Sequence, residues 1–87
     1  MPDLQHYADS AIAPSRAPFA IVPSDTERLP AATKAIYVGT GGAVTLRGVD
    51  AAADVTYRNV PSGGYLVVCA AHVRATGTTA ADLIGEA

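Results

Sequence analysis

The stretch that decides the fold runs from residue 35 to residue 48 and is AIYVGTGGAVTLRG, with three glycines between positions 39 and 42. A glycine-rich loop binds phosphate when a helix N-terminus follows it and adds backbone donors and a positive dipole end. Here Val44 and Leu46 lie two positions apart, which is the period of a strand. The stretch therefore predicts two strands joined by a hairpin turn that holds no anion.

The rest of the chain after this turn consists of short apolar segments separated by turns rich in Gly, Pro, Ser and Thr. Such brief connections join antiparallel strands, because a parallel pair needs a crossover of about a dozen residues or more. The sequence therefore predicts an all-β fold, a small antiparallel β-barrel or sandwich. The expected strands are residues 35–38, 43–47, 54–59 and 65–75, followed by a last piece at 82–84 that is a strand or a short helix.

The segment 65–75 is the longest predicted strand, and its two faces differ. Tyr65, Val67 and Cys69 begin a face that is apolar throughout, so this face is assigned to the core. Leu66 and Val68 begin the opposite face, which ends in polar residues. Because an exposed apolar pair in so small a domain needs a cover, Leu66 and Val68 are predicted to contact a neighbouring subunit.

Residues 1–34 differ in character from residues 35–87, which form the predicted β domain. The first segment holds five of the six prolines, and its apolar residues follow neither a helical nor a strand period. An irregular segment with this much apolar surface is expected to lie as an extended arm on another surface, held mainly by contacts outside its own domain. The arm residues predicted to bind a partner are Tyr7, Ile12, Phe19, Ile21 and Val22.

Charge and cysteine content exclude several classes of function. The 87-residue chain has a formal net charge of −2 and a single lysine, which argues against a nucleic-acid partner. One cysteine excludes an internal disulfide framework and is compatible with a reducing compartment. No apolar run is long enough for a membrane span, and the first residues lack the features of a signal peptide. We expect synthesis in the cytoplasm, with no membrane partner.

Few residues are placed for chemistry. His6 and His72 have no carboxylate or thiol at a metal-ligand spacing, and Cys69 is assigned to the core, where a thiol acts as a small hydrophobic group. We therefore expect no catalytic residue, no metal and no cofactor, and a protein that is not an enzyme. The competing hypothesis is a small β-fold enzyme or sensor that uses His72 and Arg74.

Tyrosines on the predicted strands allow two interpretations. Tyr37, Tyr57 and Tyr65 could form a stacking platform for bases or sugars, although packing inward or at an interface is the commoner fate of strand tyrosines. On the strand 54–59, Val55 and Tyr57 alternate with polar residues and are predicted to face inward.

Three segments carry a resemblance to a known family. The runs VPSDTERLPAATKAIYVGTGGAVTL, NVPSGGYL and VRATGTTAADLI resemble the head-spike base proteins of tailed phages and of phage-derived gene transfer agents. The resemblance covers about residues 19 to 87. It implies a short β domain without enzymatic activity that lies on the virion and forms the foot of a projecting fibre.

The resemblance leads to a specific expectation about assembly. The protein is expected to be a homo-oligomer, a pentamer or a trimer, that docks on capsid or neck proteins at a vertex and carries a fibre protein. It would be made in the host bacterial cytoplasm and reside on the virion surface. The alternatives are a tail-associated, fibre-associated or decoration protein, or a glycan-binding adhesin module.

Overall fold

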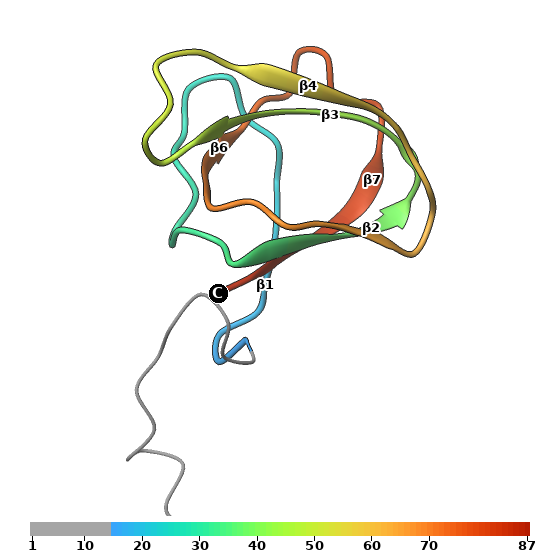
Figure 1. Ribbon diagram of the computed structural model, residues 1–87, viewed down its shortest axis with the longest axis horizontal. Helices are drawn as coiled ribbons and strands as arrows, with labels where there is room; N and C mark the ends of the chain where they lie inside the picture. The colour runs from blue at the N-terminus through green and yellow to red at the C-terminus, as the bar shows by residue number, and fades with distance from the viewer. Residues whose placement is uncertain (1–14) are drawn as a thin grey trace, which may run out of the picture.

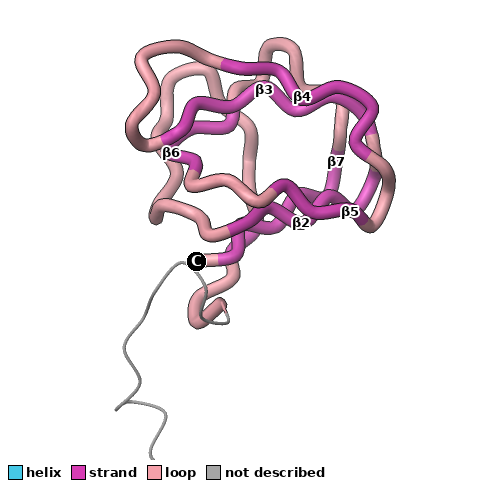
Figure 2. The backbone as a smooth tube through the Cα atoms, in the orientation of Figure 1, coloured by secondary structure: helices cyan, strands magenta, loops and turns pink. Residues whose placement is uncertain are grey.

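The computed structural model describes residues 15–87, so Tyr7, Ile12 and His6 lie outside the described part of the chain. Within it the fold is all-β, as predicted, and contains no helix (Figures 1 and 2). Accordingly, no helix that could span a membrane occurs in this range. The strands are β1 (Phe19–Ala20), β2 (Ala35–Thr40), β3 (Gly42–Gly48), β4 (Val55–Val60), β5 (Gly64–Leu66), β6 (Ala70–Val73) and β7 (Ala81–Glu86).

The strands form two antiparallel sheets that face each other (Figure 1). The first, here called sheet A, has the order β1-β7-β2-β5, and the second, sheet B, has the order β4-β3-β6. Of the successive strands, only β3 and β4 are joined as a hairpin, while the chain passes from one sheet to the other after β2, β4, β5 and β6. The C-terminal piece, for which the sequence left a strand or a short helix open, is a strand, because β7 pairs with both β1 and β2.

The glycine stretch makes a corner between the sheets, so the hairpin predicted there is wrong. A strand does follow it, but β2 and β3 belong to different sheets and do not pair. The corner packs against the turn after β4, where the Gly41 N–H donates to Ser62 Oγ at 2.8 Å. A Cβ at Gly41 would lie 2.8 Å from Ser62 N and closer still to the carbonyl oxygen of Val60, so this close backbone approach requires glycine.

The core lies between the two sheets and confirms the alternation of Val44 and Leu46 predicted for the strand 43–47. Ile36 and Val38 of β2 face Val44 and Leu46 of β3, and all four are almost fully buried. Such side chains each contribute about 1.5–3 kcal/mol when buried. The remaining strands add Val60, Ala70, Val73 and Leu83 to the same cluster.

The predicted long strand 65–75 does not exist as one element. Instead, β5 ends at Leu66 in sheet A, residues 67–69 cross between the sheets, and β6 begins at Ala70 in sheet B. The crossing is fixed by Thr33, whose side chain is buried and whose Oγ1 donates to Val68 O at 2.7 Å and accepts from Ala70 N at 3.0 Å. A buried hydroxyl that binds both backbone groups replaces the sheet hydrogen bonds that a continuous strand would make.

The described part of the predicted arm packs on its own domain. Strand β1 pairs with β7, and Ile21 and Leu29 belong to the core. After Ile21 the backbone runs along the outer edge of β6. The N–H groups of Ser24, Leu29 and Thr33 donate to carbonyl oxygens of this strand. The expectation that the arm is held mainly by contacts outside its own domain is therefore wrong for residues 15–34. Its prolines explain why no helix forms there.

Candidate interaction surfaces

The outer face of sheet A carries an apolar row that crosses all four strands. Ala20 lies opposite Ile84, Ile84 lies opposite Tyr37, and Tyr37 lies opposite Tyr65. Directly opposite residues in a sheet point to the same side. Their neighbours along the strands, such as Ile36, are buried in the core, so the row itself faces outward. We call this row, together with Val67 beyond the end of β5, the tyrosine face.

The tyrosine face exposes large apolar side chains in a fixed arrangement. The exposed fraction is 61% for Tyr65 and 88% for Val67. The rings of Tyr37 and Tyr65 meet edge to face, with centroids 5.3 Å apart and planes at 61°. An edge-to-face pair of this kind is energetically favourable and limits the freedom of both rings. The face therefore offers a partner protein a preformed aromatic patch.

The edge strand β4 exposes a second apolar pair. The register places Val55 opposite Leu46 and Tyr57 opposite Val44, on the side of sheet B that faces the core, as the sequence predicted. Even so, the exposed fractions are 54% for Val55 and 38% for Tyr57. Both lie on β4 at the edge of its sheet. An uncovered edge strand with exposed apolar residues is suited to contact with another chain.

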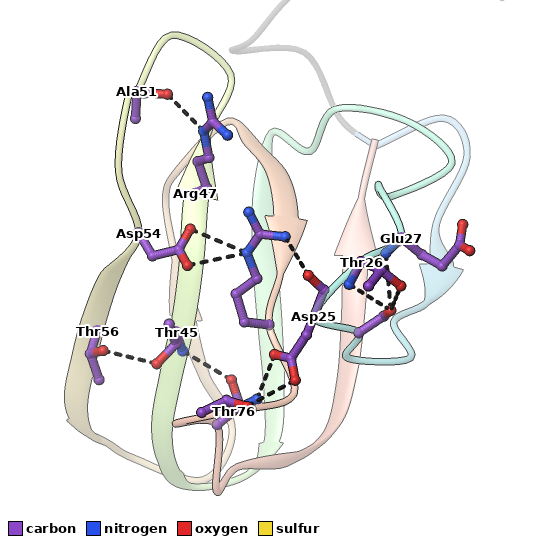
Figure 3. Close-up of polar contacts among 12 residues, drawn as sticks. Asp25, Thr26, Glu27, Thr45, Arg47, Ala51, Asp54, Thr56 and Thr76 are labelled. Atoms are coloured by element: carbon purple, nitrogen blue, oxygen red, sulfur yellow. Dashed lines mark hydrogen bonds and ion pairs between the residues drawn. The ribbon is translucent and has the colours of Figure 1, made fainter.

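The outer face of sheet B, in contrast, is polar and is bonded within the chain (Figure 3). Thr45 and Thr56 lie opposite each other on β3 and β4, and their hydroxyl oxygens are 2.8 Å apart. The backbone N–H of Thr45 donates to Thr78 Oγ1 at 3.0 Å. This part of the sheet satisfies its own polar groups and needs no partner.

Hydrogen bonds of Asp25 and Arg74 join the loop after β1 to sheet B, and Figure 3 shows Asp25 beside Thr76. The Asp25 carboxylate accepts from the backbone N–H and the hydroxyl of Thr76, at 2.9 and 2.8 Å. These hydrogen bonds, first of all the one from the backbone, lower the pKa of Asp25. Arg74 donates from Nε to both oxygens of Asp54 at 3.2 Å and from Nη1 to the Asp25 carbonyl oxygen at 3.1 Å.

The residues considered for chemistry are placed differently from the prediction. Cys69 lies in the crossing segment and is exposed as a free thiol, so its assignment to the core is wrong. The inner and outer sides are already exchanged on β5, where Tyr65 faces outward and Leu66 packs against the core, and Cys69 lies in the crossing that follows. His72 lies on β6 directly opposite Arg47, and its Nδ1 is buried without a hydrogen-bond partner in the part of the chain described.

The predicted partner-binding residues fall into three groups. Leu66 and Val68 pack against the core and do not face outward, which corrects the prediction for this pair. Ile21 is buried in the core and Phe19 packs against it, with its ring over Gly85. The exposed member of this set within residues 15–87 is Val22, at 80% exposure.

Val22 lies beside a surface groove formed by the loop after β1. The groove has a volume of about 460 Å³, and Pro23, Leu29 and Pro30 contribute apolar atoms to its lining. Val22 is exposed, as a partner-binding residue would be, and its binding role stays a prediction. The sequence offered Tyr37, Tyr57 and Tyr65 as an alternative platform but did not predict the tyrosine face. The signal that could have found it is the spacing of Tyr37 and Tyr65, each of which alternates with a buried residue of its own strand.

Comparison with known proteins gives a match among the solved structures. No protein-family model matches the chain, and no curated protein does so. Among solved structures, a chain in the structure described as "Capsid of native GTA particle computed with C5 symmetry" superposes with a TM-score of 0.81 at 36% sequence identity. The match covers 94% of this chain and 93% of the other. The chain therefore belongs to the family of this gene transfer agent (GTA) capsid chain, a family of structural proteins of phage-like particles.

Proposed function

We propose that the protein is a head-spike base, an oligomeric foot that docks on a capsid vertex and carries a fibre. Three observations support this: the family assignment, the residue runs that resemble head-spike base proteins, and a virion location, with which the matched capsid agrees. Its activity is binding, and the surfaces described above act through shape and apolar contact, without a chemical step.

The observation that carries the proposal is the tyrosine face. Interfaces are enriched in tyrosine, and an apolar row that crosses a whole sheet is suited to being covered by a partner. Tyr65 and Val67 are the most exposed large side chains of this face, with exposed fractions of 61% and 88%. They are the residues expected to lose most solvent contact when subunits assemble.

A ring of five subunits fits the surfaces that the chain presents. In a ring, each subunit uses two different patches, one for each neighbour. The tyrosine face on sheet A and the exposed pair Val55 and Tyr57 on β4 are two such patches on different sheets. The five-fold symmetry given for the matched particle favours a pentamer over a trimer for this chain.

The capsid contact is assigned to the N-terminal segment. Val22 is exposed and lines the groove together with apolar residues and the charged Glu27 and Arg28. Tyr7 and Ile12 keep the same role in the proposal, although they lie outside the described residues. Together these side chains are expected to anchor the base on the capsid, which leaves the opposite end of the sandwich for the fibre.

The experiment compares particles from a producing strain with particles from the same strain after deletion of the gene. The deletion should leave closed capsids that lack fibres at their vertices. Complementation with the parent gene should restore the fibres, whereas a gene encoding Tyr65→Glu and Val67→Glu should not. Particles that keep their fibres without the gene would contradict the role as a fibre base.

A further inference from the structure

Basic side chains gather at one end of the outer face of sheet B. Arg47 on β3 lies directly opposite His72 on β6, and Arg74 follows two positions later on the same side of the chain. Arg28 precedes Leu29, whose N–H donates to Ala71 O of β6 at 2.8 Å, and the charge of Arg28 acts on His72. We call these four residues the arginine cluster: Arg28, Arg47, His72 and Arg74.

We propose that the arginine cluster is a binding site for carboxylate groups from an acidic segment of a partner protein. This site lies on the sheet opposite the tyrosine face. Arg28 also lines the groove assigned to the capsid contact, whereas Arg47, His72 and Arg74 take no part in the contacts assigned to assembly.

The charges at this end of the sheet do not balance. The charges of three arginines act on His72 against one carboxylate, that of Asp54, which already pairs with Arg74 at 3.2 Å. The Asp25 carboxylate accepts hydrogen bonds from Thr76 and also feels the charge of Arg74, so two carboxylates stand against three guanidinium groups. The cluster is therefore a positive patch on a chain whose formal net charge is −2. Such a patch attracts an anionic partner and orients it during encounter.

The donors of the cluster are held in place for a ligand. Arg47 donates from Nε to Ala51 O at 2.9 Å, which fixes the guanidinium plane and leaves its terminal nitrogens directed away from that carbonyl (Figure 3). Arg74 is fixed in the same way by Asp54. A guanidinium group whose plane is fixed loses little freedom when it binds a carboxylate with two parallel hydrogen bonds.

His72 supplies a group that responds to the ligand. Its Nδ1 has no hydrogen-bond partner within residues 15–87. Desolvation lowers the pKa of His72, and the charges of the three arginines lower it further, while Asp54 acts in the opposite direction. A carboxylate bound among the arginines would offset their charges and raise this pKa. By linkage, the acidic ligand should bind more tightly as the pH falls and His72 takes up a proton.

A protein segment fits this site better than a nucleic acid does. Four residues at one end of a three-stranded sheet can meet one or two carboxylates. A nucleic-acid surface needs a longer basic stripe to follow the phosphate backbone, and this chain has one lysine.

The test uses the full-length protein and a synthetic hexaglutamate peptide at low salt. Isothermal calorimetry should show binding that weakens by roughly tenfold in Arg47→Gln, since one charge-assisted contact is lost. Arg58→Gln on β4 removes the same charge away from the cluster and should retain most of the binding. Circular dichroism of both variants checks that the fold is intact.

A second measurement follows the His72 ring by NMR, with His6→Gln used to assign the two histidines. Saturating peptide should raise the pKa of His72. The proposal is overturned if the peptide fails to bind, if Arg47→Gln and Arg58→Gln weaken binding equally, or if the pKa of His72 does not move. It is also overturned if inorganic phosphate or a DNA duplex binds the cluster more tightly than the peptide.

Discussion

The two outer faces of the sandwich use opposite chemistry. Sheet A turns an aromatic and aliphatic row to solvent, with Tyr37 and Tyr65 in edge-to-face contact. Sheet B turns hydroxyl and charged groups outward, and much of their bonding capacity is met within the chain, as in the pair Thr45 and Thr56. A face whose polar groups are hydrogen-bonded within the chain adds to the stability of the subunit. An exposed apolar face instead lowers the free energy of the assembly when a partner covers it.

The difference between the faces separates folding from assembly. Substitutions on the tyrosine face should affect subunit contacts and spare the fold, because the core lies on the other side of sheet A. Substitutions in the hydrogen-bonded part of sheet B should change the free energy of unfolding and leave assembly intact. The predictions below use this separation.

The largest effect is expected from charging the side chains beneath sheet A. Leu66→Glu with Val68→Glu places two carboxylates against the core and should lower the free energy of unfolding by at least about 3 kcal/mol. The matched pair Tyr65→Glu with Val67→Glu changes alternate residues of the same segment and should keep a β-rich circular dichroism spectrum. If both pairs unfold the domain, the assignment of inner and outer sides is wrong.

The next effect concerns the crossing between the sheets. Thr33→Val keeps the side-chain volume but removes the hydroxyl that binds Val68 O and Ala70 N, which leaves buried backbone groups unpaired. Urea unfolding should show a loss of about 2 kcal/mol. Thr26→Val, at an exposed position, is the control and should change stability by less than about 0.5 kcal/mol. Equal effects of the two substitutions would show that Thr33 does not fix the crossing.

A smaller effect is expected on the polar face of sheet B. Thr45→Val and Thr56→Val each remove the hydrogen bond between the two hydroxyl groups. A double-mutant cycle should give a coupling of about 1 kcal/mol between them. Sedimentation should show that the oligomer persists in the double variant. Additive single effects would mean that the face is not held by this bond.

The smallest effect is a dependence on pH at Asp25. Hydrogen bonds from Thr76 hold the pKa of this carboxyl below its ordinary value of 3.8. The stabilisation is therefore present above pH 3.8 and is lost as the pH falls through the lower pKa of the folded state. Asp25→Asn should make the fall of Tm on acidification below pH 3.8 smaller than in the parent, because the variant has no carboxylate to protonate at this position. A parent and variant with identical pH profiles would contradict the contribution of this contact.

The β architecture was predictable because local signals agree with it. In β2 and β3, Ile36, Val38, Val44 and Leu46 alternate with residues that point outward, and the glycine stretch between them allows the sharp corner. Period-two alternation and turn chemistry therefore suffice to predict these strands. The corner differed from the predicted hairpin because a turn sequence does not specify which sheet the next strand joins.

The inner and outer sides of residues 65–69 were not predictable in the same way. Both sides of this segment are apolar at its start, so alternation cannot tell them apart. The deciding group is Thr33, 35 residues earlier than Val68, whose hydroxyl fixes the crossing. The same non-local cause applies to Ile21 and Leu29, since their burial depends on β6 and β7. Because the inner and outer sides were exchanged in the prediction, Tyr65 and Val67 were assigned to the core and the tyrosine face was not predicted.

The most direct test of the account is the mass of the intact protein in solution, measured by native mass spectrometry or light scattering. The account predicts that the parent is an oligomer of five chains and that Tyr65→Glu with Val67→Glu is a folded monomer. Val49→Glu, a substitution of an exposed apolar residue off the tyrosine face, is the matched control and should remain an oligomer. A parent that is monomeric in solution, or a Tyr65 and Val67 variant with the mass of the parent oligomer, would contradict the assignment of the tyrosine face as the subunit contact.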